Sequence, residues 1–452
     1  GHDTHGAAVT LCILDWSVQN SGLDVVGYKN LVGLVDIPAS DGFQVAGMGF
    51  PGLYFGKLPS PCFDEDGKFI FVTTQWGSVQ KIVRVSVADG TVTPLDIQIN
   101  PSDESTKNSY ASQSLLCITK DGGLIMSESS PDQSACVGYI PQKYLAAEDL
   151  SQKLVGQLLS KMPPIAASSF SSVASDALSN QEAFTSEVLS LQAPQVPGAV
   201  DSPIQCILLC PKNVENPPLI VVPHGGPHGC SSTTFIPSYA FLCSQGGYAI
   251  LHVNYRGSTG FGEGPLNSLP GKIGEVDVKD MVEATKTVCK SGKVDPTRVG
   301  ICGGSHGGFL TGHLIGQYPD LFKVAAMRNP VTNIASMVTS TDIPDWCYVE
   351  ALGSGKYDWK EYRGPTKEEL DIMWKASPIA HVKNAVAPTL VALGMSDQRV
   401  PPSQGLEYFY TLRSKGVKTK LLMYEKDDHA IDGVVSEADH WINIKQWFDE
   451  HL

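Results

Sequence analysis

Short runs of hydrophobic residues, separated by polar turns, dominate the first half of the chain and are typical of β-strands. Runs at 69–72 and 81–87 are rich in β-branched and aromatic residues, and an Ala-Asp-Gly turn leads from the second into a returning segment at 91–93. A similar strand-turn-strand unit follows at 115–126. The Asp-Gly turns at Asp66-Gly67 and Asp121-Gly122 lie about one propeller-blade length apart, since blades repeat roughly every 40–50 residues. The pattern therefore favours β-propeller blades, with a β-sandwich as the alternative.

The pattern changes between residues 144 and 197, where Ser, Ala, Gln and Pro dominate. We interpret this stretch as an irregular blade followed by a linker, with an amphipathic helix near 150–159. The first residues, 7–14, are interpreted as a strand from the middle of a blade.

From residue 204 onward, strands alternate with helices. Continuous apolar runs are typical of strands that are buried on both faces, and a 3.6-residue period is typical of amphipathic helices. This alternation implies a mostly parallel sheet with helices on both faces. The predicted fold is therefore an incomplete all-β propeller portion with its linker over 1–197, followed by an α/β domain over 198–452. The predicted strands are 219–222, 248–253, 298–302, 389–393 and 421–424, and the predicted helices are 278–289, 309–318 and one opened by Ser436.

Composition narrows the range of partners. The chain has 452 residues, which favours two domains, and 42% hydrophobic with 18% charged residues indicates a folded protein. A formal net charge of −14 argues against a nucleic-acid partner. No apolar run is long enough to span a membrane, so no membrane partner is expected. The eleven cysteines are dispersed without metal-type spacing, which favours reduced thiols in the cytoplasm.

The segment Gly303-Gly304-Ser305-His306-Gly307 is the sharpest chemical motif of the chain. It follows a predicted strand and precedes a predicted helix. A Gly-X-Ser-X-Gly sequence in that context predicts the nucleophile elbow of an α/β-hydrolase domain, with Ser305 as the nucleophile. A chance glycine turn is the alternative, and the strand-to-helix setting argues against it.

A serine hydroxyl is a weak nucleophile, so it needs a general base and a carboxylate that orients the base. In this fold the order along the chain is Ser, Asp or Glu, and then His. Asp397 and His429 each follow a predicted strand, where open α/β sheets place their sites. We therefore predict Ser305, Asp397 and His429 as the catalytic triad.

Neighbouring polar residues are weaker candidates. Asp427 and Asp428 precede His429 and are interpreted as surface charges. His440 is predicted to lie on the solvated face of the closing helix, and His381 precedes a strand, so neither is expected to be the base.

Acyl transfer also needs backbone N–H groups that bind the oxyanion. One is expected from His306 and another from the Gly-rich loop His224-Gly225-Gly226-Pro227-His228, which follows the first buried strand of the α/β domain. The histidines of these motifs lack ligand spacing with a carboxylate, so no metal site is expected, and no cofactor is implied.

Three motifs together resemble the prolyl oligopeptidase family of serine peptidases: the loop at 224–228, Asn-Tyr-Arg-Gly-Ser-Thr-Gly-Phe-Gly at 254–262, and the elbow at 303–308. The segments 328–337 and 340–347 resemble the acylaminoacyl-peptidases of that family more closely. The resemblance implies a cytoplasmic exopeptidase that removes an N-acylated amino acid from short blocked peptides, with a β-propeller as a size filter.

The resemblance also implies roles for particular residues. Gly226 and His306 would supply the oxyanion N–H groups. Arg399 would bind the carbonyl of the acyl group or of the preceding residue, unless it is simply a surface arginine. Trp346 would approach the side-chain pocket.

The chain departs from the family pattern at its start, because only about three blades fit before residue 203. Incomplete propellers leave unpaired strand edges. The missing blades are therefore expected on a companion chain or to have been cleaved off, and homo-oligomers of unspecified size are expected. The alternatives for function are a dipeptidyl-peptidase or oligopeptidase of the same family, an esterase, and a non-catalytic binding module, which the complete triad disfavours.

Overall fold

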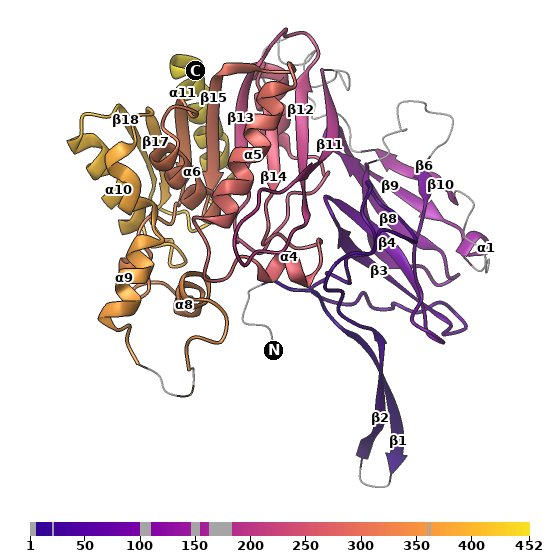
Figure 1. Cartoon of the computed structure of the whole chain (residues 1–452). Coiled ribbons are helices and arrows are strands. Elements are labelled where there is room, and N and C mark those ends of the chain that lie inside the picture. Colours follow the sequence, from indigo (N-terminus) through magenta and orange to yellow (C-terminus); the bar gives the residue numbers. More distant parts are fainter. Residues whose placement is uncertain are drawn as a thin grey trace.

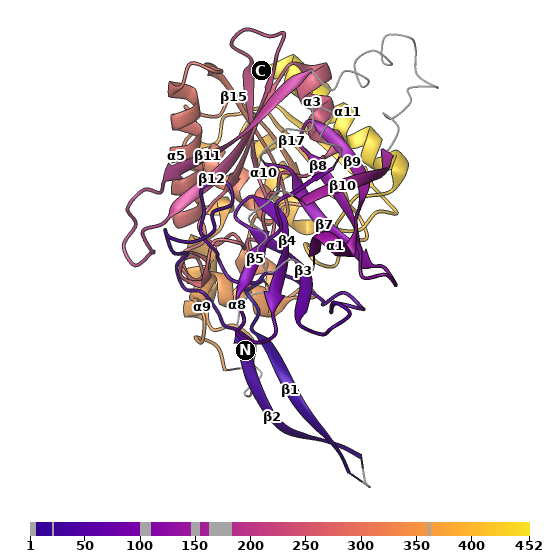
Figure 2. The same ribbon diagram turned by 90° about the vertical axis from the view of Figure 1, so that its right-hand side faces the viewer.

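The computed structural model describes residues 6–19, 22–99, 110–145, 154–161, 183–358, 360 and 363–452. An α/β region, drawn in pink to yellow in Figure 1, lies beside a β-rich region, drawn in indigo to purple. The hairpin of β1 (Leu11–Gln19) and β2 (Gly22–Val32) projects away from both regions, and the second view in Figure 2 shows the same projection.

The α/β region is built on an eight-stranded sheet with the order β11-β12-β14-β13-β15-β16-β17-β18. β11 and β12 pair antiparallel to their neighbours, and the strands from β14 to β18 are parallel. Every residue of β13, β14 and β17 is buried, as their continuous apolar runs predict. The strands are β11 (Phe184–Gln192), β12 (Pro203–Pro211), β13 (Pro218–Pro223), β14 (Ala249–Asn254), β15 (Asp295–Gly304), β16 (Val324–Arg328), β17 (Thr389–Gly394) and β18 (Thr419–Tyr424).

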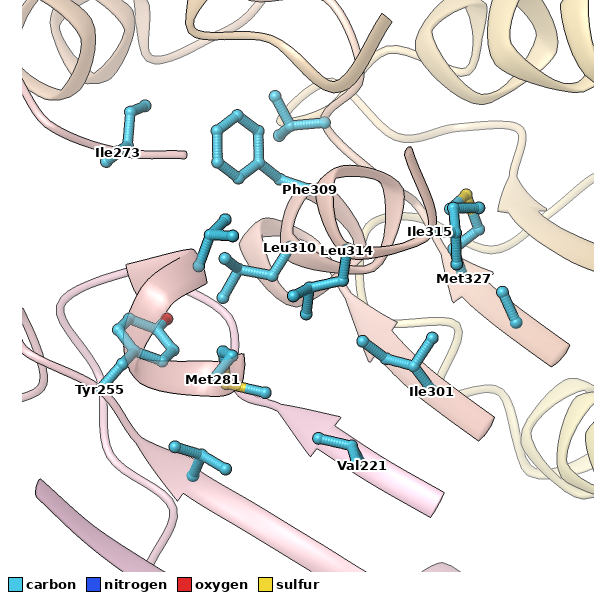
Figure 3. Packing of buried hydrophobic residues seen from close by; sticks show 14 of the residues in the cluster. Val221, Tyr255, Ile273, Met281, Ile301, Phe309, Leu310, Leu314, Ile315 and Met327 are labelled. Carbon is cyan, nitrogen blue, oxygen red and sulfur yellow. The ribbon is translucent and has the colours of Figure 1, made fainter. Parts of the chain in front are cut away.

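Helices cover both faces of this sheet, which the strand–helix alternation predicts. One core contains residues of α5, α6 and α10, and the other contains residues of α3 and α11. Figure 3 shows the first core, where Leu310 and Leu314 of α6 lie over Val221 and Ile301 of the sheet. The helices are α1 (Gln142–Leu145), α3 (Pro237–Gly246), α4 (Glu263–Asn267), α5 (Val276–Lys290), α6 (His306–Gln317), α7 (Ile334–Met337), α8 (Pro344–Leu352), α9 (Lys367–Lys375), η2 (Pro378–Asn384), α10 (Ser403–Ser414) and α11 (Val434–His451).

The β-rich region contains two further sheets, of three and five strands, and is partly propeller-like. Both strand-turn-strand units predicted from the sequence are present, as the antiparallel pairs β4–β5 and β7–β8. The three-stranded sheet is β3 (Phe69–Trp76), β4 (Val79–Ser86) and β5 (Val92–Pro94); the five-stranded sheet is β6 (Ile97–Ile99), β7 (Ser112–Ile118), β8 (Leu124–Ser130), β9 (Gln133–Ile140) and β10 (Leu154–Lys161).

Three expectations need correction. The helix predicted near 150–159 is wrong for the described residues 154–159, which belong to strand β10 and pair with β9 and β6. Leu154 and Gly156 are buried and their described neighbours are exposed, which is the period-2 pattern of a strand. Residues 150–153 lie outside the described residues. The segment at 7–14 is not a blade strand, because β1 begins at Leu11 and pairs only with β2. Finally, β11 pairs with β12 along its whole length, so the eight-stranded sheet starts before the expected boundary at 197/198.

No helix within the described residues has the length and apolar character needed to cross a membrane. All eleven cysteines are free thiols.

Candidate active site

The turn between β15 and α6 places Ser305 at the carboxyl edge of the sheet. Its backbone lies at φ 59° and ψ −122°, a conformation that a non-glycine residue rarely adopts and that is typical of functional sites. The flanking glycines are sterically required. A Cβ on Gly303 would lie 2.2 Å from the Gly307 carbonyl oxygen, and one on Gly307 would lie 2.3 Å from that of Pro223.

The structure brings Ser305, His429 and Asp397 into one hydrogen-bonded line. His429 Nε2 lies 3.0 Å from Ser305 Oγ, and His429 Nδ1 lies 2.7 Å from Asp397 Oδ2. The other carboxylate oxygen of Asp397 accepts hydrogen bonds from the backbone N–H groups of Arg399 and Val400, each at 2.9 Å. Because Asp397 is buried and fully bonded, it can hold the imidazole in one orientation while Nε2 faces the hydroxyl.

The Gly-rich loop after β13 lies directly against Ser305. A Cβ on Gly225 would lie 3.4 Å from Ser305 Cβ, and Gly226 is exposed with φ at +118°. No hydrogen bond recorded among the described residues uses the backbone N–H of Gly226 or of His306. His306 is also the first residue of α6, where the helix dipole favours negative charge. Both amides are therefore available to an oxyanion formed beside Ser305.

Two buried histidine–carboxylate pairs support these two amides. His306 Nε2 lies 2.9 Å from Asp277 Oδ2, and His228 Nε2 lies 3.1 Å from Glu350 Oε1. Burial disfavours the protonated imidazole of His228, but the Glu350 carboxylate and the Gly257 carbonyl more than offset this and raise its pKa. The sequence motifs identify the histidines, but not their partners, which come from α5 and α8 and carry no local motif.

Helix α8 touches the Gly-rich loop at a second point. The indole N–H of Trp346 donates to the Gly226 carbonyl at 2.9 Å, one helical turn before Glu350. The loop that carries one of the two available amides is thus held through Trp346 and through the His228–Glu350 pair.

Two histidines outside the site, His440 and His381, are not placed to act as the general base. The expected solvated position of His440 is wrong: the residue is fully buried, because the face of α11 that carries it packs its ring near Tyr424 and Trp441. Burial lowers the pKa of His440 to about 4. His381 lies in η2, away from the triad, with its ring near His313. Within the described residues, no group of three or more His, Cys, Asp or Glu residues could hold a metal ion.

A pocket of about 230 Å³ opens beside Ser305. This volume is below the roughly 300–1,000 Å³ of pockets for drug-sized ligands, and it suits one amino-acid side chain.

The Arg399 side chain, which lines this pocket, is 46% exposed and forms an ion pair with Asp342, with Nε 2.7 Å from Oδ1. The pocket is lined mainly by apolar groups: Gly226, Ser305, Val331, Met337, Ile343, Trp346, Arg399, Val400 and His429.

Comparisons with known proteins agree with this geometry. Residues 234–452 match the prolyl oligopeptidase family, and residues 2–160 match the N-terminal domain of acylamino-acid-releasing enzymes. Acylamino-acid-releasing enzyme 1 of Oryza sativa is 36% identical over 99% of this chain and 55% of its own length. The human acylamino-acid-releasing enzyme is 34% identical over 99% of this chain and 56% of its own length. The chain thus spans about half the length of the curated relatives it matches.

Solved structures show the same fold. A Pyrococcus horikoshii acylaminoacyl peptidase superposes with a TM-score of 0.64 at 20% identity, covering 84% of this chain and 54% of that one. A puromycin-hydrolysing peptidase of Mycobacterium tuberculosis superposes with a TM-score of 0.66 at 21% identity, covering 95% of this chain and 57% of that one.

Proposed function

Because the chain belongs to the prolyl oligopeptidase family of serine peptidases, we propose that it is a serine exopeptidase that releases an N-acylated amino acid from the N-terminus of short blocked peptides. One observation carries the proposal. Ser305, His429 and Asp397 form a hydrogen-bonded line with distances of 3.0 and 2.7 Å, beside a pocket sized for one side chain.

The reaction is an acyl transfer in two steps. His429, oriented by Asp397, takes the proton of Ser305 as the hydroxyl attacks the scissile carbonyl. The backbone N–H groups of Gly226 and His306 stabilise the oxyanion, an effect worth about 3–4 kcal/mol for one donor in related enzymes. His429 then protonates the leaving amine, and water deacylates the enzyme through the same base.

The charge at the pocket mouth fits an acylated substrate. The acylated residue places its side chain beside Trp346, and Arg399 donates to the carbonyl of the acyl group. The Arg399–Asp342 pair is exposed, with side chains 46% and 41% accessible, so it contributes little and can exchange for a substrate carbonyl at low cost.

Paired assays on the chromogenic amides of acetyl-alanine and of free alanine test this proposal. The expected result is hydrolysis of the acetylated amide at a much higher kcat/KM. A preference for a free amino terminus would indicate a dipeptidyl-peptidase instead. Hydrolysis of p-nitrophenyl esters without cleavage of either amide would indicate an esterase. A series of acetylated Ala, Ser, Met and Leu amides would then map the pocket.

The proposal includes further propeller blades, on the same or on a companion polypeptide, that complete a size filter over the site. Its support is that, among the described residues, no further strand extends the two sheets beyond β3 and β5 or beyond β6 and β7, and that the curated relatives are almost twice as long as this chain. It also includes a reducing, cytoplasmic setting, which the eleven free thiols support. Homo-oligomers are part of the proposal as well.

A further inference from the structure

Asn329 lies where the three triad loops meet, and neither its sequence context nor the proposed reaction gives it a role. It follows β16 directly, the strand between the one that leads to Ser305 and the one that leads to Asp397. Only 1% of its surface is exposed, and its backbone has a positive φ of 40°. A buried polar side chain in this conformation is costly unless its hydrogen bonds are made.

The side-chain amide of Asn329 bonds to both loops that carry the imidazole and its carboxylate partner. Its Nδ2 donates to the backbone carbonyl of His429 at 2.9 Å and to that of Asp428 at 3.3 Å. Its Oδ1 accepts from the backbone N–H of Gly394 at 2.9 Å, at the end of the strand that leads to Asp397. One amide therefore fixes the main chain of the general base relative to the loop of the residue that orients it.

The backbone on either side of Asn329 holds the nucleophile. The Ser305 N–H donates to the Arg328 carbonyl at 2.9 Å, and the Val331 N–H donates to the Ser305 carbonyl at 3.4 Å. The Asn329 N–H itself donates to Ala392 of β17 at 2.9 Å. The four residues 328–331 thus contact the main chain around all three triad members.

The chemistry of this position selects asparagine. Its side chain supplies two donors and one acceptor, and it tolerates the left-handed backbone better than most residues do. Aspartate has the same shape, but it would turn a carboxylate oxygen toward two carbonyl oxygens. Glycine accepts the backbone conformation, but it makes none of the three side-chain bonds.

We propose that Asn329 is a positioning residue: its side chain holds the main chain of His429 at the correct position relative to Asp397 and Ser305. This inference rests on the triad chemistry of the proposed function, but not on the identity of the substrate. Misplacing a catalytic group by about 1 Å can cost on the order of 10²-fold in rate. The side chain of Asn329 does not line the pocket, so its loss acts on the chemical step rather than on substrate binding.

The test compares Asn329→Gly with Asn216→Gly in the full chain. Asn216 also has a positive φ, of 48°, but it is exposed and distant from the site, so the second variant reproduces the backbone change alone. The measurements are kcat and KM on acetyl-alanine p-nitroanilide, the rate of Ser305 labelling by a fluorophosphonate, and the unfolding midpoint. Labelling needs no correct guess of the substrate, so it still tests the inference if the proposed substrate class fails.

Asn329→Gly should lower kcat and the labelling rate by about 10²-fold with KM within a factor of three, and Asn216→Gly should leave all three unchanged. Rates are measured well below the unfolding midpoint of each variant. If the glycine variant does not fold, the isosteric variant Asn329→Asp is measured instead, and the same changes in kcat, labelling rate and KM are expected. Labelling and kcat within threefold of the wild type in a folded Asn329 variant would overturn the inference. A loss that only follows the folded fraction would do the same.

Discussion

The α/β region and the β-rich region differ in how their sheets are enclosed. The eight-stranded sheet is covered by helices on both faces, and every triad residue comes from its carboxyl edge. The β-rich region has only small sheets and a projecting hairpin, and its described sheets have no helical layer like those of the eight-stranded sheet. The difference places every triad residue in one region and none in the other.

Many hydrogen bonds join the two regions, and several of them are buried. The Ser78 N–H donates to Gln205 Oε1 at 2.9 Å, and the Ala8 N–H donates to Glu263 Oε1 at 2.9 Å. Neither contact includes a triad residue. Changes at the carboxyl edge of the eight-stranded sheet, where the triad lies, should therefore reduce the rate, whereas changes elsewhere in either region should mainly alter stability.

The largest expected effect comes from the nucleophile. Ser305→Ala should lower kcat by about 10⁶-fold without unfolding the protein, because the hydroxyl is lost while its surroundings stay packed. Amide hydrolysis and thermal unfolding are the measurements. Ser114→Ala, a change in the β-rich region, is the matched control and should leave kcat unchanged. An unchanged turnover number in Ser305→Ala would refute the triad.

A pair of glycine substitutions gives the next largest contrast. Gly226→Ala adds a Cβ 2.7 Å from the His228 nitrogen at φ +118°, so the Gly-rich loop must move and the proposed oxyanion donor with it. The kcat should then fall by about 10²–10³-fold. Gly67 in the β-rich region has φ +68° and no atom within 4 Å of its Cβ position, so Gly67→Ala should cost only about 1–2 kcal/mol of stability. Equal effects of the two variants on kcat would remove the distinction between the regions.

Acid should destabilise the α/β region through its buried histidines. Burial lowers the pKa of His224, His252 and His440 to about 4, whereas the unfolded chain binds these protons near pH 6.5. The unfolded state then holds more protons between these values, so the stability present above pH 6.5 is lost as the pH falls toward 4.

Urea denaturation at pH 7.5 and at pH 5.0 measures this effect. Each such histidine contributes at most about 1.4 kcal/mol per pH unit in that window. His440→Gln should lose less stability than the wild type between the two pH values. An identical loss in the two proteins would show that His440 does not contribute.

The smallest expected effect lies at the junction of the regions. Gln205 is 1% exposed and also donates to the Ala46 carbonyl at 3.1 Å, so Gln205→Ala leaves buried polar groups unpaired and should cost about 1–3 kcal/mol. The kcat/KM on a single-residue acetylated amide should stay within threefold. Gln192→Ala, at an exposed glutamine of β11, is the control for denaturation. A loss of rate without a loss of stability would contradict the division of roles.

The sequence predicts best where burial leaves a periodic or continuous signal. Strands β13, β14 and β17 can be recognised in the sequence as continuous apolar runs, because both of their faces are covered. The nucleophile elbow can be recognised by its glycines, because the backbone approaches other backbone atoms closely there. The helix predicted over the segment of β10 is wrong because a short leucine-containing run fits either period.

Partners that are distant in sequence are not visible in the same way. The burial of His440 depends on rings from another element, and a helical period alone does not show which faces of the closing helix are covered. Asp277 and Glu350 pair with histidines far along the chain, and Asn329 bonds to main-chain groups that have no side-chain signature.

The central claim is that Ser305, activated by His429 and Asp397, forms an acyl-enzyme. The most direct measurement is acid quenching during turnover of acetyl-alanine p-nitrophenyl ester, followed by peptide mapping by mass spectrometry. The account predicts an acetyl-alanyl group on Ser305, absent when His429 is replaced by alanine. An acyl group on another residue of the folded wild-type protein, or none under conditions of rapid turnover, would contradict it.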